Sequence, residues 1–384
     1  MRFANRVANL PPYVFATVEK MIAAQQAKGA DVINLGIGSP DLAPPKFVVD
    51  ALYQSALKPD THGYAGYYGI PGLRRALADY YGRRFGVELD PATEIRPLIG
   101  SKEGLANCAL AYVDPGDLVL VPDPGYPTYA MGTLLAGGET YAMPLTEDKG
   151  YLVDFSAIPA DVAARAKVMW LSYPNNPTGA VAPLEFLAQA VDFARAHDLL
   201  ICYDNPYADV TFDGYVAPSI LQGPGAKDVT IEFNSLSKTY NMAGWRIGMA
   251  VGNAAAVDAL TTVKTHIDSG IFRPIQDAAV AALTGDQSWL PERNLIYQRR
   301  RDIIMEWLPK LGMSAQAPTA GLYVWAKVPP GVDCTQYCMD MLEKAKVWLT
   351  PGTAYGDYGQ GFIRISLCTK EERLKEAGER LISV

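Results

Sequence analysis

The chain has 384 residues, of which 49% are apolar and 20% charged, and its formal net charge is −7. This length suits one large core or two domains of ordinary size. The negative charge excludes an electrostatic footprint for nucleic acid or an anionic membrane surface. No apolar run approaches the ~20 residues that span a bilayer, and no signal-peptide pattern is evident. Five cysteines and three histidines indicate neither a disulfide framework nor a metal site, so we expect a cytoplasmic protein without metal.

The first part of the chain predicts a helix, a strand and a glycine-containing turn. Residues 12–28 have apolar side chains at helical spacing, and Gly29 suits the position after a helix. A short strand over residues 31–37 leads into Gly36-Ile37-Gly38. A dinucleotide loop is excluded here, because a third glycine is missing and Pro40 prevents a following helix. These glycines instead favour a close approach of the backbone to a ligand.

Residues 44–56 and 71–85 are predicted to be helices, separated by a loop rich in tyrosine and glycine over residues 61–72. Composition alone leaves open whether this loop is a packing corner or part of a ligand-binding wall.

From residue 94 to residue 251, short apolar runs alternate with helical patterns. Helices are expected near residues 102–113, 126–136 and 183–197, and the strands are expected at 95–99, 118–121, 168–171, 199–203, 229–233 and 247–251. Strands that are apolar throughout and alternate with helices indicate an α/β fold with a mostly parallel sheet covered on both faces. Ligands bind beyond the carboxyl ends of such strands, where this chain has polar residues. After about residue 283, the pattern changes to a smaller α+β unit that begins with a helix over residues 291–308.

The most informative stretch is Asn234–Gly248, which lies between two of these apolar runs. It contains Lys238, with Ser235 and Ser237 before it and Arg246 after it. Hydroxyl groups and a guanidinium suit a dianionic phosphate, and a lysine beside a phosphate pocket suggests a pyridoxal cofactor. The motif Ser-x-Ser-Lys alone would be no more than a polar loop.

Four other stretches contain candidate site residues. Ser101 and Lys102 begin a helix, whose free backbone N–H groups form an anion site, and Ser101 can also be the N-cap. Tyr126 follows a strand in an Asp-Pro-Gly-Tyr-Pro turn. Asn176 lies in Asn-Asn-Pro-Thr-Gly, a turn sequence that is common in its shortest form. Arg364 stands between β-formers, where it is either a solvated edge arginine or a partner for a carboxylate.

Together these stretches resemble the class I/II aminotransferases, which are fold-type-I enzymes dependent on pyridoxal phosphate. The resemblance runs from Asn34 to Arg364 and implies a large domain with a seven-stranded, mostly parallel sheet (residues 46–283) and a small α+β domain (residues 1–45 and 284–384). It also implies a homodimer with shared active sites, in which Tyr64 reaches the phosphate of the partner's cofactor. Within the class, the chain looks most like LL-diaminopimelate aminotransferase-type sequences.

The resemblance assigns a role to each candidate. Lys238 carries the cofactor covalently and moves the proton at the substrate Cα. Asp204 pairs with the pyridine nitrogen, Tyr126 stacks on the ring, and Asn176 and Tyr207 contact the 3′ oxygen. The phosphate is bound by Ser235, Ser237 and Arg246, and Ser101 and Lys102 contribute to cofactor binding through the backbone N–H groups of the anion site. The substrate is contacted by Arg364 through its α-carboxylate, and by Gly38, Asn176 and Tyr13.

Two positions leave the substrate open. The subgroup has an asparagine–glycine pair from the partner subunit where this chain has Ser269-Gly270. Lys102 either binds the distal carboxylate of a dicarboxylic substrate or is a helix-start lysine without a ligand. The expected reaction moves an amino group between an L-amino acid and a 2-oxo acid, with LL-diaminopimelate and 2-oxoglutarate/glutamate as the expected pair. Aspartate or alanine transamination, a pyridoxal C–S β-lyase and a non-catalytic regulator are the alternatives.

Overall fold

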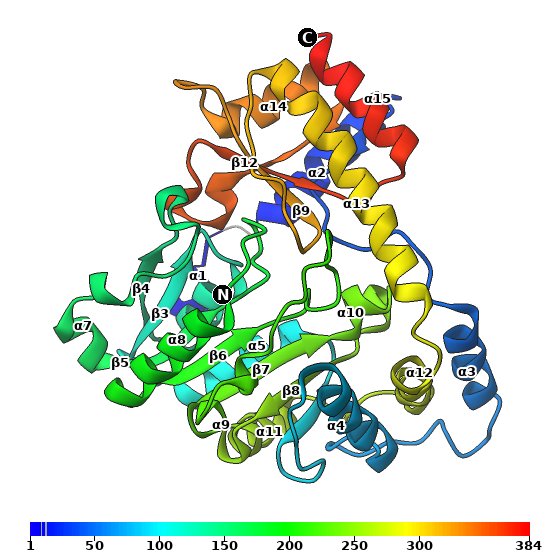
Figure 1. The fold of residues 1–384 in the computed structure, drawn as a ribbon, viewed down its shortest axis with the longest axis vertical. Helices are drawn as coiled ribbons and strands as arrows, with labels where there is room; N and C mark the ends of the chain where they lie inside the picture. The colour runs from blue at the N-terminus through cyan, green and yellow to red at the C-terminus, as the bar shows by residue number, and fades with distance from the viewer. Residues whose placement is uncertain (9, 12–13) are drawn as a thin grey trace.

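The computed structural model describes residues 1–8, 10, 11 and 14–384. Its central feature is a seven-stranded sheet in the order β2-β8-β7-β6-β5-β3-β4 (Figure 1). Only β8 runs against its neighbours, and the other pairs are parallel. The strands are β2 (Ile95–Leu98), β3 (Leu118–Asp123), β4 (Glu139–Pro144), β5 (Ala166–Leu171), β6 (Leu200–Asp204), β7 (Thr230–Ser235) and β8 (Gly248–Gly252). The mostly parallel sheet predicted from the apolar runs is thereby confirmed.

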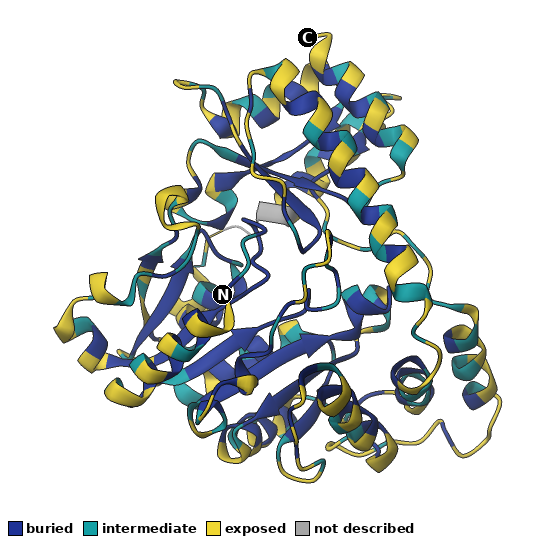
Figure 2. Ribbon diagram, viewed as in Figure 1, coloured by how far each residue is buried: buried dark blue, intermediate teal, exposed yellow. Residues whose placement is uncertain are grey.

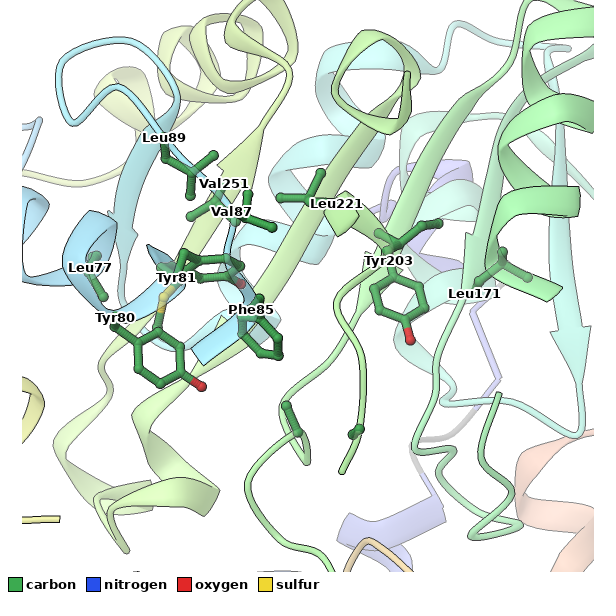
Figure 3. Packing of buried hydrophobic residues seen from close by; sticks show 14 of the residues in the cluster. Leu77, Tyr80, Tyr81, Phe85, Val87, Leu89, Leu171, Tyr203, Leu221 and Val251 are labelled. Atoms are coloured by element: carbon green, nitrogen blue, oxygen red, sulfur yellow. The ribbon is translucent and has the colours of Figure 1, made fainter. Parts of the chain in front are cut away.

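Successive residues of each central strand point to opposite faces of the sheet. In β5, Met169 and Leu171 pack into one hydrophobic cluster, whereas Val168 and Trp170 pack into another on the opposite face. Both faces are therefore covered, which is why most residues of these strands are apolar. Figure 3 shows the first cluster, where Leu77, Tyr81 and Phe85 lie near Val251.

Helices supply the other half of each cluster. On the first face they are α4 (Pro71–Phe85), α8 (Leu184–His197) and α12 (Arg273–Thr284), the last of which packs on α3 (Lys46–Ala56). On the second face they are α5 (Ser101–Tyr112), α6 (Thr128–Ala136) and α11 (Ala254–Ile267). The remaining short helices are α1 (Asn5–Ala8), α7 (Ala160–Arg165), α9 (Ala226–Val229) and α10 (Leu236–Thr239). No helix within the described residues combines the length and apolar character needed to cross a membrane.

A third hydrophobic cluster surrounds a small antiparallel sheet in the order β11-β12-β9 (Figure 1). Its strands are β9 (Tyr323–Lys327), β11 (Thr350–Pro351) and β12 (Phe362–Ser366), and β1 (Ile33–Asn34) pairs in parallel with β10 (Val347–Trp348). The helices around it are α2 (Val14–Gln26), α13 (Trp289–Trp307), α14 (Cys334–Lys344) and α15 (Glu371–Ile382). In Figure 2, buried strands lie beneath helices whose outer surfaces are exposed.

The N-terminal and C-terminal segments share this third cluster, because Val18, Ile22 and Leu35 pack with residues from β9, α13 and α15. The same cluster also includes Phe212, so it extends into the part of the chain that carries the large sheet. We retain the division into residues 46–283 and residues 1–45 with 284–384 as a proposal, which limited proteolysis would test.

Candidate active site

A cavity of about 360 Å³ lies at the carboxyl ends of the strands of the large sheet. Ser101, Tyr126, Asn176, Asp204 and Ser235 line it, and each lies at or shortly after the end of a different strand. Opposite them, the cavity is lined by residues of the small sheet and of the segment that follows β1. The complete lining is Glu19, Gly36, Ile37, Gly38, Ser101, Lys102, Tyr126, Asn176, Asp204, Pro206, Tyr207, Ser235, Ser237, Lys238, Ala243, Arg246, Tyr323 and Arg364.

Among the described residues that the sequence indicated for this site, all except Tyr64 line the cavity. The Tyr64 side chain is 91% exposed in the single chain and does not line the cavity. Tyr13 lies outside the described residues.

Lys238 is held on α10, a helix of only four residues that directly follows β7. Ser235 caps this helix, because its Oγ accepts a hydrogen bond from the Ser237 amide. The Ser235 hydroxyl also lies 2.8 Å from the Ser237 hydroxyl. The Lys238 ammonium donates to the carbonyl of Gly38, so the amine points across the cavity toward the segment that follows β1.

Arg246 and the start of α5 form the corner where phosphate binding was predicted. Gly100, rather than Ser101, occupies the N-cap of α5, so the N-cap assignment of Ser101 was wrong. Gly100 has φ of +72°, and a Cβ built there would lie 2.2 Å from Nη2 of Arg246. Glycine is required here for two reasons. It adopts this backbone region freely, and it leaves room for the guanidinium. Ser101 then opens the helix with its backbone N–H free for an anion.

Asp204 ends β6 and is buried. The Tyr129 hydroxyl donates to Oδ2 of Asp204 at 2.8 Å, whereas Oδ1 has no hydrogen-bond partner among the described residues. Burial raises the pKa of this carboxyl to about 7, against the opposing effects of the Tyr129 hydrogen bond and the Lys238 charge. A half-satisfied carboxylate at the base of a cavity is suited to a cationic partner such as a protonated ring nitrogen.

Arg364 lies on β12, the central strand of the small sheet, and only 3% of it is exposed. The interpretation as a solvated edge arginine is therefore wrong. Its Nη1 donates to Oδ1 of Asn176 at 2.8 Å, and its Nη2 donates to the carbonyl of Gly36 at 2.6 Å. The guanidinium also lies 3.9 Å from the ring centroid of Tyr323. A planar cation fixed in this way can present a fork to a carboxylate in the cavity.

Tyrosine hydroxyls extend this wall of the cavity. The hydroxyl of Tyr207 lies 3.1 Å from that of Tyr323. Across the cavity, the ammonium of Lys102 lies 5.9 Å from the ring centroid of Tyr126. The rings of Tyr126, Tyr207 and Tyr323 and the side chain of Lys102 therefore line the same cavity as Asp204.

Glu19 and Tyr323 line the cavity, but the sequence analysis missed both. Glu19 lies on the predicted helix α2 outside any motif, so nothing distinguished it from a solvated glutamate. Tyr323 follows Gly321-Leu322 in an apolar run that also describes an ordinary core strand. Recognising either residue required the packing of the small sheet against the large one.

The described residues fit pyridoxal phosphate. Asp204 has a bare buried oxygen for the ring nitrogen, and Ser235, Ser237 and Arg246 gather donors for a phosphate. The Lys238 amine lies in the same cavity as these groups.

Comparison with known proteins identifies the family to which this arrangement belongs. The family model for aminotransferase class I and II matches residues 30–381. The chain belongs to the class I and II aminotransferases. Its cofactor is therefore pyridoxal phosphate, and its reaction is the transfer of an amino group.

Individual members of this aminotransferase family match along the whole chain. The LL-diaminopimelate aminotransferase of Moorella thermoacetica is 54% identical over 381 residues, covering 99% of this chain and 98% of that protein. A substrate-bound structure of BacF from Bacillus subtilis is 38% identical, with a TM-score of 0.97 over 100% of this chain and 98% of that one. The aspartate aminotransferase of Thermus thermophilus is 31% identical, with a TM-score of 0.93 and full coverage (100%) of both chains. The two TM-scores show that both solved structures share the fold of this chain.

Proposed function

We propose that this aminotransferase acts on LL-diaminopimelate, with 2-oxoglutarate and glutamate as its oxo-acid and amino-acid partners. The observation that carries this proposal is the 54% identity to the LL-diaminopimelate aminotransferase of Moorella thermoacetica over nearly the full length of both chains. The charges in the cavity provide a second, independent reason.

Each charged side chain of the cavity can be matched to the group of the cofactor or of the substrate that it would bind. Pyridoxal phosphate supplies an electron sink and a carrier for the amino group when it is bound. Lys238 and Asp204 serve its carbonyl carbon and its ring nitrogen, and Arg246 serves its phosphate. Arg364 serves the substrate α-carboxylate, and the cation of Lys102 and the anion of Glu19 also line the cavity.

One cation and one anion match the distal end of LL-diaminopimelate, which carries a carboxylate and an ammonium. Aspartate has only a distal carboxylate, and alanine has no distal charge. A cavity with both Lys102 and Glu19 therefore favours the diamino dicarboxylate. Aspartate transamination is the second candidate, because Lys102 alone could bind its distal carboxylate and a Thermus thermophilus aspartate aminotransferase has the same fold.

The residues themselves perform binding and proton transfer. Arg364 holds the substrate carboxylate from the small sheet, and Asn176 orients the guanidinium through their shared hydrogen bond. The free amine of Lys238 then removes the proton from the substrate Cα as a general base. When the cofactor is bound, ionised Asp204 would pair with the ring nitrogen and favour its protonated form.

We also propose that the active site is completed in a homodimer. Tyr64 is 91% exposed in the single chain, and Tyr68 and Phe272 nearby are also exposed. The Ser269-Gly270 turn lies against this same loop, because a Cβ on Gly270 would come within 2.2 Å of the Gly66 carbonyl oxygen. Mixing two inactive variants, Tyr64→Ala and Lys238→Ala, should restore activity if the sites are shared, because one site of each hybrid is then intact. No recovery in hybrids of confirmed mixed composition would contradict it.

A transamination panel tests the substrate. We expect the highest kcat/KM for LL-diaminopimelate with 2-oxoglutarate, and lower values for aspartate, alanine and tyrosine. A preference for aspartate would replace the proposal with the second candidate. Release of pyruvate and ammonia from cystathionine would instead establish the β-lyase reaction. The cytoplasmic location expected from the sequence is kept as part of the proposal.

A further inference from the structure

The helix α13 carries Arg293, a buried arginine that contacts the segment of the catalytic lysine. Its side chain is 3% exposed. Nη1 donates to the backbone carbonyl of Lys238 at 2.6 Å, and Nη2 donates to the backbone carbonyl of Asp209 at 2.9 Å. The next residue, Asn294, also donates to the Asp209 carbonyl, at 3.1 Å. Residues at the start of α13 thus bind the main chains of two segments, which follow strands β7 and β6 of the large sheet.

Lys238 needs such external support because α10 is too short to hold it. A helix of four residues forms barely more than one turn and is unstable on its own. In a longer helix, the amide of Met242 would donate to the Lys238 carbonyl. Here it donates to Leu236 instead, because Asn241 adopts φ of +55° and reverses the chain. The guanidinium of Arg293 satisfies the carbonyl that the helix leaves without a helical donor.

The same helix also contacts the substrate side of the cavity. Two turns further along α13, Arg300 donates to both carboxylate oxygens of Asp41, at 2.7 and 2.9 Å, and to the carbonyl of Leu367 at 3.1 Å. Asp41 follows the Gly36–Gly38 segment that lines the cavity, and Leu367 follows the strand of Arg364. Figure 1 shows α13 running from beside α10 to beside α15. One continuous helix therefore joins the lysine side to the carboxylate side.

We propose that Arg293 is a positioning residue for Lys238: it fixes the main chain from which the amine reaches the substrate Cα, while Arg300 fixes the segment that receives the carboxylate. The proposal rests on the proposed role of Lys238 but not on the identity of the substrate. Displacing a proton-transferring amine by about 1 Å lowers turnover without removing any binding contact. Arg293 should therefore act on kcat, whereas Arg300 should act on KM.

Amide hydrogen exchange in the cofactor-free protein provides a readout independent of activity. Arg293→Met should accelerate exchange in residues 236–242 and leave residues 36–41 unchanged. Arg300→Met, a matched substitution on the same helix, should do the reverse. Uniformly faster exchange in both segments would show that Arg293 merely stabilises the whole fold and would overturn the proposal.

Steady-state kinetics provide the second readout. Arg293→Met should lower kcat by up to ~100-fold with little change in KM, and an α-deuterated donor should show a larger isotope effect because proton removal has become slower. Arg293→Lys keeps the charge but cannot bridge both carbonyls, so it should give a smaller change in the same direction. If Arg293→Met does not fold, Arg293→Lys alone decides. The positioning role would be overturned if kcat, the isotope effect and the amide exchange of residues 236–242 were all unchanged in Arg293→Lys.

Discussion

Arg364 and Asn176 are directly joined, because Nη1 of the guanidinium donates to Oδ1 of the amide at 2.8 Å. Asn176 follows β5 of the large sheet, and Arg364 belongs to the central strand of the small one. The group that we propose to bind the substrate carboxylate and a group expected to contact the cofactor therefore share one hydrogen bond. Under the proposed roles, substrate recognition and cofactor geometry are coupled at this point.

Replacing Arg364 should weaken the binding of every substrate to a similar degree. Arg364→Ala removes the fork for the α-carboxylate, and the loss of a buried charged contact costs about 2–5 kcal/mol. We expect KM to rise for LL-diaminopimelate, aspartate and glutamate alike, as measured by initial rates. Arg364→Lys should recover only part of the affinity, because an ammonium cannot bind bidentately. An increase for one donor alone would assign Arg364 to a substrate side chain instead.

Lys238 should be the sole attachment point of the cofactor. In Lys238→Ala, the absorbance band of lysine-linked cofactor should disappear, and borohydride reduction should leave no label on the peptide containing residues 234–248. Lys238→Arg retains the charge without a nucleophilic amine and serves as the control. An unchanged spectrum or a label on another lysine would refute the assignment.

Asp204 should make the stability of the cofactor-free protein depend on pH. Its pKa is raised from 3.8 to about 7 by burial, so between these values the folded protein binds more protons than the unfolded chain. The free energy of unfolding should therefore fall as the pH rises from about 4 to about 7. Asp204→Asn removes this contribution, so the variant should match the wild type at the acid end and exceed it near neutrality.

Urea unfolding across that pH window measures this difference. Glu232, whose pKa burial also raises to about 7, contributes to the slope of both proteins and cancels in the comparison. Bound cofactor should remove the contribution of Asp204 to the pH dependence of the free energy of unfolding, because a cationic ring nitrogen favours the ionised carboxylate. Parallel curves for the wild type and Asp204→Asn would contradict the assignment.

Gly38 should tolerate no side chain. A Cβ at this position would lie 1.8 Å from the Tyr323 hydroxyl, so Gly38→Ala must displace either the ring or the segment. We expect KM for α-amino acids to rise and the melting temperature to fall. Gly82→Ala on the exposed side of α4 is the matched control, because a Cβ there meets no atom within 4 Å. Equal effects of the two substitutions would mean that the close approach at Gly38 has no role in binding.

We expect Glu19 to contribute to substrate selectivity by binding the distal ammonium of LL-diaminopimelate. L-2-aminopimelate lacks only the distal amino group of LL-diaminopimelate, so it isolates this contact. Glu19→Gln should lower kcat/KM for LL-diaminopimelate by about tenfold, as for loss of a charged hydrogen bond, and should not change it for L-2-aminopimelate. Lys20→Gln on the same helix is the control. Equal losses of kcat/KM with both substrates would mean that Glu19 stabilises α2 and does not determine selectivity.

The order of elements was predictable wherever both faces of a strand are buried. Six strands of the large sheet were recognised because their residues are mostly apolar, with few charged interruptions such as Arg96 in β2 and Glu232 in β7. The seventh, β4, was missed as a segment because it lies at the sheet edge and is mostly exposed, which leaves no apolar run. The cap of α5 was misassigned because the need for glycine at position 100 comes partly from its close approach to Arg246, which is far away in the chain.

The candidate site was predictable where chemistry and local spacing coincide, as around Lys238 and Asp204. Glu19 and Tyr323 were not recognised, because only the packing of the small sheet brings them to the cavity. The burial of Arg364 likewise depends on its two neighbouring strands, β9 and β11, which the residues around Arg364 do not reveal. The interaction expected for Tyr64 involves a second copy of the chain and remains a prediction.

The bare oxygen of Asp204 has a consequence for the abundance of the enzyme in a cell. A ligand that binds only the folded state stabilises it by mass action, and here the vitamin B6 derivative supplies the partner that this carboxylate lacks. When that vitamin is scarce, newly made chains keep an uncompensated polar atom in their interior and unfold more often. Proteases would then remove them faster, which would match the amount of enzyme to the supply of its coenzyme.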